Sequence, residues 1–161
     1  MRTFAMIAAL LLAGSAAPAT AGENAAVTAR VNAFVDEWHQ DAALARPAYF
    51  DKIAPDGIYI GTDRTERWTR EAFQAWAARA FARPSAWTLT PRERHVSCSA
   101  DGTIIWFDEQ LDSGMGLLQA TGVVRAVDGR LEIVHYQLSI AVPNEVQPRV
   151  TEIIAGFEGG K

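Results

Sequence analysis

Two long apolar-rich runs joined by Asp128-Gly129 constrain the fold more than any other stretch of the chain. Asp-Gly between two such runs predicts a two-residue turn, because both central residues of that turn take positive φ. The flanking runs, 117–127 and 131–142, are rich in β-branched residues and have no interior proline, as central strands require. The sequence therefore predicts a long antiparallel hairpin over residues 117–142.

Helical and alternating patterns place the other elements around this hairpin. Apolar residues at three- and four-residue spacing predict main helices over 24–41, 69–83 and 148–157 and a short helical segment over 47–52. A short strand is predicted at 58–60, after a turn at Pro55-Asp56-Gly57, and two longer strands at 87–99 and 103–111. Helices segregated from a meander of antiparallel strands indicate an α+β domain, with a cone-shaped curved sheet packed on the N-terminal helices.

The first 21 residues have the features of a secretory signal peptide. A basic Arg2 precedes an apolar run over 4–13, and the small-residue site Ala19-Thr20-Ala21 follows. That run is too short for a membrane span, which disfavours the alternative of a retained anchor. We therefore expect cleavage near Ala21, export to the periplasm or the medium, and one domain over residues 22–161.

Composition and motif content exclude several classes of partner. The formal net charge is −4 and no basic patch is present, so we expect no nucleic-acid partner. The single cysteine, Cys98, cannot form an intrachain disulfide. The three histidines lack close metal-ligand spacing, and the chain has no dinucleotide or phosphate-loop fingerprint. We therefore expect neither a metal nor a cofactor.

Adjacent carboxylates in the 103–111 strand are the first candidates for chemistry. Asp108 and Glu109 must point to opposite faces of the sheet, so one of them should face the cavity. Asp108 shares its face with Trp106, and a carboxylate in an apolar cavity has a raised pKa that suits a general acid or base. The alternative is a structural carboxylate paired with an arginine across the sheet.

Two further candidates come from the other strands. His135 lies in the returning arm of the hairpin, where it could titrate near neutral pH, and Gln137 shares its face. Tyr59 lies in the short strand 58–60 and could assist an acid or base. The alternative for His135 is a core histidine bonded to a neighbour.

The polar stretch 61–68 between a predicted strand and a predicted helix forms another candidate site. Trp68 could line the mouth of the cavity, with Thr62 and Glu66 as polar contacts of a ligand. Trp106 and Gln137 are further candidate ligand contacts. In the alternative, the loop is structural and its side chains cap backbone N–H groups.

Three stretches of the chain resemble a known family. APDGIYIGTDRTERWT, IIWFDEQL and TGVVRAVDGRLEIVHYQLSIAVPNE resemble the SnoaL-like branch of the nuclear-transport-factor-2-like superfamily, and the resemblance extends over residues 25–154. It implies a cone-shaped, commonly dimeric α+β fold with a cavity between helices and sheet. The superfamily includes ketosteroid isomerase, scytalone dehydratase and polyketide cyclases, together with members of no known activity. Gln119-Ala120-Thr121-Gly122 stands where relatives are expected to have Arg-Gly-Ser-Gly, and Gln119 cannot replace that charge.

Two classes of function remain open from the sequence. The chain could be an exported binding domain whose cavity accepts a small, largely apolar molecule without turnover. It could instead be an acid–base enzyme resembling the isomerases and dehydratases, with Asp108 as base and His135 or Tyr59 assisting. Because both hairpin arms mix apolar and polar residues on each face, we also expect the convex face to be partly buried in a homodimer.

Overall fold

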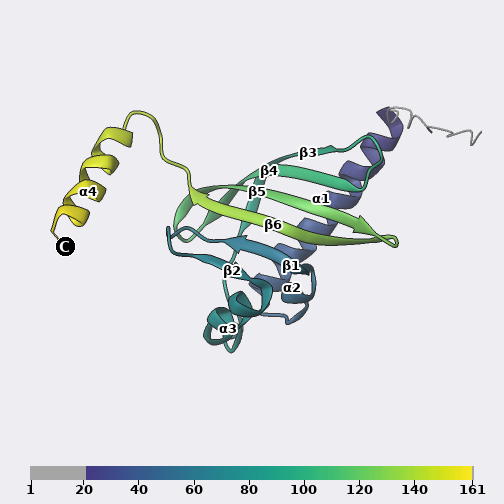
Figure 1. The fold of residues 1–161 in the computed structure, drawn as a ribbon, viewed down its shortest axis with the longest axis horizontal. Coiled ribbons are helices and arrows are strands. Elements are labelled where there is room, and N and C mark those ends of the chain that lie inside the picture. Colours follow the sequence, from purple (N-terminus) through teal and green to yellow (C-terminus); the bar gives the residue numbers. More distant parts are fainter. Residues whose placement is uncertain (1–20, 161) are drawn as a thin grey trace, which may run out of the picture.

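The computed structural model describes residues 21–160 as four helices and six strands (Figure 1). The N-terminal part runs in the order α1 (Ala21–Ala43), α2 (Ala48–Asp51), β1 (Ile53–Ile60), β2 (Arg67–Thr69) and α3 (Arg70–Phe81). The C-terminal part runs in the order β3 (Thr90–Cys98), β4 (Ile104–Ser113), β5 (Gly116–Val127), β6 (Arg130–Ile140) and α4 (Gln147–Gly159). The expected signal peptide lies outside the described residues apart from Ala21, where α1 begins.

All six strands form one curved sheet in the order β2-β1-β6-β5-β4-β3. Strands β3 to β6 pair antiparallel with their neighbours in sequence, and α1 runs behind this meander (Figure 1). The predicted α+β class, with helices on a curved meander sheet, is confirmed. One pairing was not expected: β1 lies parallel to β6, and β2 then adds antiparallel to β1.

The central hairpin forms with the predicted turn. Asp128 and Gly129 have φ of 48° and 75°, and Val127 pairs with Arg130 across the turn. Both positive values are those of the turn that Asp-Gly favours, so the sequence signal and the backbone agree.

A bulge in β6 changes which residues face the interior. Val123 pairs with His135 while Val124 pairs with Ile133, so the arm gains one residue at this point. Ile133 and Tyr136 are therefore both buried, although strict alternation placed Ile133 on the same face as His135. His135 and Gln137 lie on the outer face instead, because the alternation restarts after the bulge.

The core lies between α1 and the inner face of the sheet. Val31, Val35 and Trp38 form the predicted stripe of α1, and all three are fully buried. The ring of Phe107 packs over Gly122 on the neighbouring strand, where an added Cβ would lie 2.4 Å from the ring atoms. Only a residue without a side chain lets the two strands accommodate this ring.

Two segments differ from the expected local structure. Strand β1 begins at Ile53 and continues through Pro55-Asp56-Gly57, which the sequence had predicted as a turn, with an irregular register in its pairing to β6. Helix α4 forms where predicted but lies away from the core (Figure 1), and its Glu158 forms an ion pair with Arg64 in the loop between β1 and β2. Its Ile153 and Phe157 side chains are 63% and 64% exposed, so its apolar stripe is not part of the core. Within residues 21–160, no helix is long and apolar enough to span a membrane.

Candidate functional site

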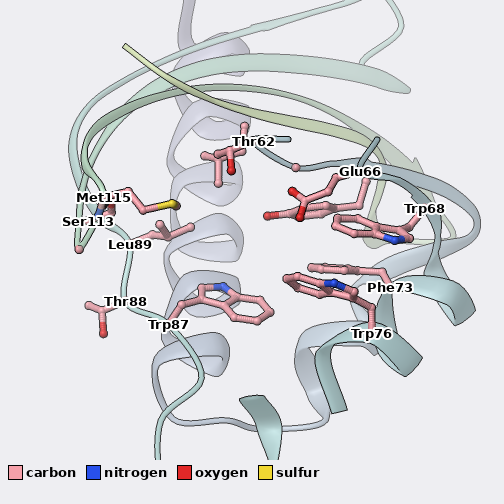
Figure 2. A pocket seen from close by; sticks show the side chains of 14 residues that line it. Thr62, Glu66, Trp68, Phe73, Trp76, Trp87, Thr88, Leu89, Ser113 and Met115 are labelled. Atoms are coloured by element: carbon pink, nitrogen blue, oxygen red, sulfur yellow. Dashed lines mark hydrogen bonds between the residues drawn. The ribbon is translucent and has the colours of Figure 1, made fainter. Parts of the chain in front are cut away.

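A pocket of about 420 Å³ opens at one end of the sheet (Figure 2). Its lining comes from the ends of β1 and β2, from α3, from the segment before β3 and from the turn between β4 and β5. Leu138 of β6 completes the lining, so segments that are distant in sequence meet around one cavity. The lining is mostly aromatic and aliphatic, with a few polar groups.

Aromatic rings form one wall of the pocket. Trp68 on β2 lies 5.4 Å from Phe73 and 4.8 Å from Trp76, measured between ring centroids. Trp87, which precedes β3, lies 5.9 Å from Phe73 and closes the pocket from the other side (Figure 2). These arrays follow from local structure, because Phe73 and Trp76 are three residues apart on one face of α3.

The start of α3 fixes the position of Trp68 relative to the helix. Thr69 adopts extended backbone angles, and its side-chain oxygen accepts a hydrogen bond from the backbone N–H of Ala72 at 3.3 Å. This N-cap residue directly follows Trp68, and the helix begins at Arg70. The capping role of Thr69 is thus part of how the aromatic wall is built.

Among the residues that the structure describes, Glu66 is the only charged side chain that lines the pocket. The loop before it is closed by hydrogen bonds: Gly61 N–H donates to the Glu66 carbonyl at 2.9 Å, and Asp63 N–H donates to Glu66 Oε2 at 3.1 Å. The carboxylate therefore has a fixed place at the pocket, toward which it points in Figure 2. Its other oxygen, Oε1, accepts no hydrogen bond from any residue in the described part of the chain.

Tyr59 lies at the inner end of the pocket and is 5% exposed. Its ring stacks on Phe73 with centroids 3.9 Å apart. Burial is the main cause that raises the pKa of the Tyr59 hydroxyl far above 10. A hydrogen bond with Tyr49 lowers this pKa, and the negative charge of Glu66 raises it further. The hydroxyl therefore remains protonated across the physiological range.

The expectation that Asp108 faces the cavity is wrong. Its side chain is 61% exposed on the outer face of β4, where Oδ2 lies 3.1 Å from His95 Nδ1. Trp106 shares this outer face and is 48% exposed, so it does not line the pocket either. The physical reason is the strand register, because Phe107 and Glu109 occupy the inner face and the intervening residues must point outward.

Glu109 is the interior carboxylate, but it does not line the pocket. Its side chain is fully buried, and it accepts hydrogen bonds from His39 Nε2 at 2.8 Å, Tyr136 Oη at 3.0 Å and Arg94 Nε at 2.9 Å. Burial alone would raise the pKa of Glu109, but the hydrogen bond and charge of His39, together with Arg94, outweigh burial and hold it below 4.5. This carboxylate is ionised and fully engaged within the fold.

The structure brings together only part of the predicted site. Tyr59, Thr62, Glu66 and Trp68 all line one pocket. His135 and Gln137 lie on the outer face of β6 because of the bulge, so they do not line the pocket.

Several pocket residues were not predicted as such. The spacing of Trp38 and Trp76 on the apolar stripes of their helices predicts that both are core residues; Trp38 is buried, but Trp76 is 55% exposed at the pocket. Trp87 and Met115 come from the segment before β3 and from the β4–β5 turn. Among these, only Trp76 carried a sequence signal, because it lies one helical turn after Phe73 and eight residues after Trp68.

The residues described here include no group of three or more His, Cys, Asp or Glu side chains that could hold a metal ion. The Cys98 side chain is half-buried at the end of β3.

Comparison with solved structures defines the class of fold. The chain is similar to a nuclear-transport-factor-2-like protein of unknown function from Pseudomonas putida, with a TM-score of 0.62, 14% identity, and coverage of 76% of this chain and 92% of that one. It is also similar to a cystatin-like-fold protein from Caulobacter vibrioides, with a TM-score of 0.59, 14% identity, and coverage of 78% and 99%. A proposed ketosteroid isomerase from Parabacteroides distasonis gives a TM-score of 0.56, 17% identity, and coverage of 70% and 86%. These likenesses show a nuclear-transport-factor-2-like fold.

The sequence itself places the chain more narrowly. The SnoaL-like domain model matches residues 31–143, which is more than half of the chain. The protein therefore belongs to the SnoaL-like domain family, as the resemblance of its sequence stretches had indicated. No curated protein matches the chain.

Proposed function

We propose that this domain binds a small, largely apolar molecule in the aromatic pocket between α3 and the end of the sheet. The observation that carries the proposal is the pocket itself, whose volume of about 420 Å³ lies within the range typical of small-molecule sites. Its walls are aromatic and aliphatic, with a few convergent polar groups such as Glu66 and Thr62. Such a combination gives apolar affinity and a means of orienting a ligand.

The acid–base alternative has less support from the geometry. Asp108 lies outside the interior, and Glu109 is occupied by three side-chain donors and lies away from the pocket. An enzyme of this class needs a pocket carboxylate within hydrogen-bond reach of a second polar group. Glu66 is the sole carboxylate that lines the pocket, and no hydrogen bond joins it to Tyr59 in the described structure. Binding is therefore the function that the site supports best.

A calorimetric titration with 1-naphthalenemethanol tests this proposal. The wild-type protein should bind the alcohol, and Trp76→Ala should weaken binding by about 1 kcal/mol, or roughly fivefold, because it removes part of the aromatic wall. Trp76 is already half exposed, so the change leaves the core intact.

Trp106→Ala provides the matched control for this titration. It removes a tryptophan of similar exposure from the outer face, away from the pocket, and should leave the affinity unchanged. Equal loss of affinity in the two variants, or no binding by wild type, would contradict the proposal.

The expected assembly and export are also proposals. Ile104, Trp106 and Val123 share the outer face of β4 and β5, where the first two are 41% and 48% exposed. Exposed apolar residues grouped on one sheet face support a homodimer through that face. Sedimentation should give a dimer at micromolar concentration for wild type and a monomer for Trp106→Glu.

The composition of residues 1–21 supports export, which remains a separate proposal. Cell fractionation of the full-length chain, followed by mass measurement of the mature N-terminus near Ala21, tests it. Recovery of the uncleaved chain from the cytoplasm would count against export.

A further inference from the structure

We propose that the pocket selects organic cations: aromatic or bulky apolar molecules that carry a protonated amine. This inference rests on the proposed function and names the chemical class of its ligand. It follows from the charge of the pocket, from the fixed position of one carboxylate and from the aromatic walls around it.

The ionisable groups at the pocket give it a negative charge. Glu66 lines it, and no lysine, arginine or histidine within residues 21–160 does. No ion pair joins Glu66 to a basic residue of the described chain, whereas most other acidic groups near the sheet have an arginine, lysine or histidine partner. The charge of Glu66 is therefore available to a ligand.

The loop holds this carboxylate in place without using all of its acceptors. Glu66 Oε2 accepts from Asp63 N–H, which fixes the side chain against its own loop. The same oxygen lies too close to the backbone of Gly61 for a Cβ to fit there, so the glycine lets the carboxylate fold back close to the chain. Oε1 then has free lone pairs at the pocket, and a carboxylate oxygen of this kind accepts N⁺–H donors strongly.

The surrounding walls favour a cation that also has apolar surface. Trp68, Trp76 and Trp87 enclose the space next to the carboxylate, as Figure 2 shows. A hydrated inorganic cation would gain little from these rings, whereas an arylalkyl ammonium would bury its apolar part against them and place its nitrogen at Glu66. Anionic ligands are disfavoured, because a carboxylate or phosphate would meet the charge of Glu66 with no basic group to offset it.

Three probes of nearly the same shape separate charge from apolar binding. 1-Naphthylmethylammonium, 1-naphthalenemethanol and 1-naphthoate share a ring system and carry a positive, zero and negative charge. Calorimetric titration of each into the full protein at neutral pH should give the tightest binding for the ammonium, about tenfold tighter than the alcohol, and the weakest binding for the naphthoate. The magnitude is that of a charged hydrogen bond in a partly open site.

Glu66→Gln tests the origin of the preference. Glutamine keeps an oxygen that can accept from Asp63 N–H, so the loop is retained while the charge is removed. The ammonium and the alcohol should then bind within about twofold of each other. Glu71→Gln is the matched control, because Glu71 is an exposed acid of α3 that does not line the pocket, and it should keep the full preference.

The outcomes separate the preference for cations from the proposed binding function. Equal affinity of wild type for ammonium and alcohol, or an unchanged preference in Glu66→Gln, overturns the cation inference while the binding function stands. Failure of all three probes to bind overturns the proposed function itself. A tenfold preference that disappears only in Glu66→Gln supports both.

Discussion

Replacing Glu109 by Gln should destabilise the domain by about 3 kcal/mol. Glu109 is fully buried, and Arg94, whose side chain is 5% exposed, lies with Nη2 2.7 Å from Glu109 Oε2. Removing one partner of a buried ion pair costs about 3–5 kcal/mol, because the other charge remains buried without compensation. We expect the lower end, since Arg94 retains an ion pair with Asp36 at 2.9 Å.

Urea denaturation followed by tryptophan fluorescence measures this loss of stability. Glu93→Gln serves as the control, because Glu93 is 62% exposed on the neighbouring strand and should change the unfolding free energy by less than about 0.5 kcal/mol. Tyr136→Phe, which removes one donor to the charged Glu109, should cost about 1.5 kcal/mol. Glu109 on β4 accepts hydrogen bonds from His39 on α1 and Arg94 on β3, so these side chains link α1 to the sheet. An unfolding midpoint of Glu109→Gln equal to that of wild type would refute the view that this network holds α1 to the sheet.

The same carboxylate gives the destabilisation a defined pH dependence. Because the folded pKa of Glu109 lies below its ordinary 4.5, its ionised form contributes stability that is present above pH 4.5. That contribution is lost as the pH falls through the folded pKa, where the buried carboxylate takes up a proton. The difference in unfolding free energy between wild type and Glu109→Gln should therefore narrow below pH 4.5. A constant difference down to pH 3 would contradict the assignment.

Two further predictions concern the sheet. Asp108→Asn should lower the pKa of His95 towards 6.5, because the hydrogen bond that His95 Nδ1 donates to the Asp108 carboxylate is the main cause that raises this pKa. NMR titration of the imidazole measures the change, and an unaltered pKa would exclude this pairing. Gly122→Ala should lower the free energy of unfolding, measured by urea denaturation, by about 1–3 kcal/mol, because its Cβ would collide with the Phe107 ring. Gly114→Ala is the control, because a Cβ there meets nothing within 4 Å and should lower it by less than about 1 kcal/mol. Equal losses in the two variants would refute the packing argument.

The local signals of the sequence predicted most of the fold. Asp128-Gly129 specified its turn, and the spacing of Val31, Val35 and Trp38 specified the buried face of α1. These features depend on contacts between near neighbours or on a simple periodicity. The parallel pairing of β1 with β6 depends on residues about 80 positions apart, and no local pattern encodes such a contact.

The site was predicted only where its residues lie in one short stretch of sequence. Tyr59, Thr62, Glu66 and Trp68 are close in sequence, and the structure keeps them together at the pocket. The assignments of Asp108 and His135 failed because they depended on which face of a strand points inward. A single bulge reverses that face in β6, and in β4 the choice between two adjacent acids could be made only from tertiary packing.

A crystal structure of the protein with 1-naphthylmethylammonium tests the central claim most directly. The account predicts density for the naphthyl ring in the pocket between Trp68 and Trp87, with the ammonium nitrogen within hydrogen-bond distance of Glu66 Oε1. An empty pocket, with the ligand bound instead on the outer face of the sheet against Trp106, would contradict it.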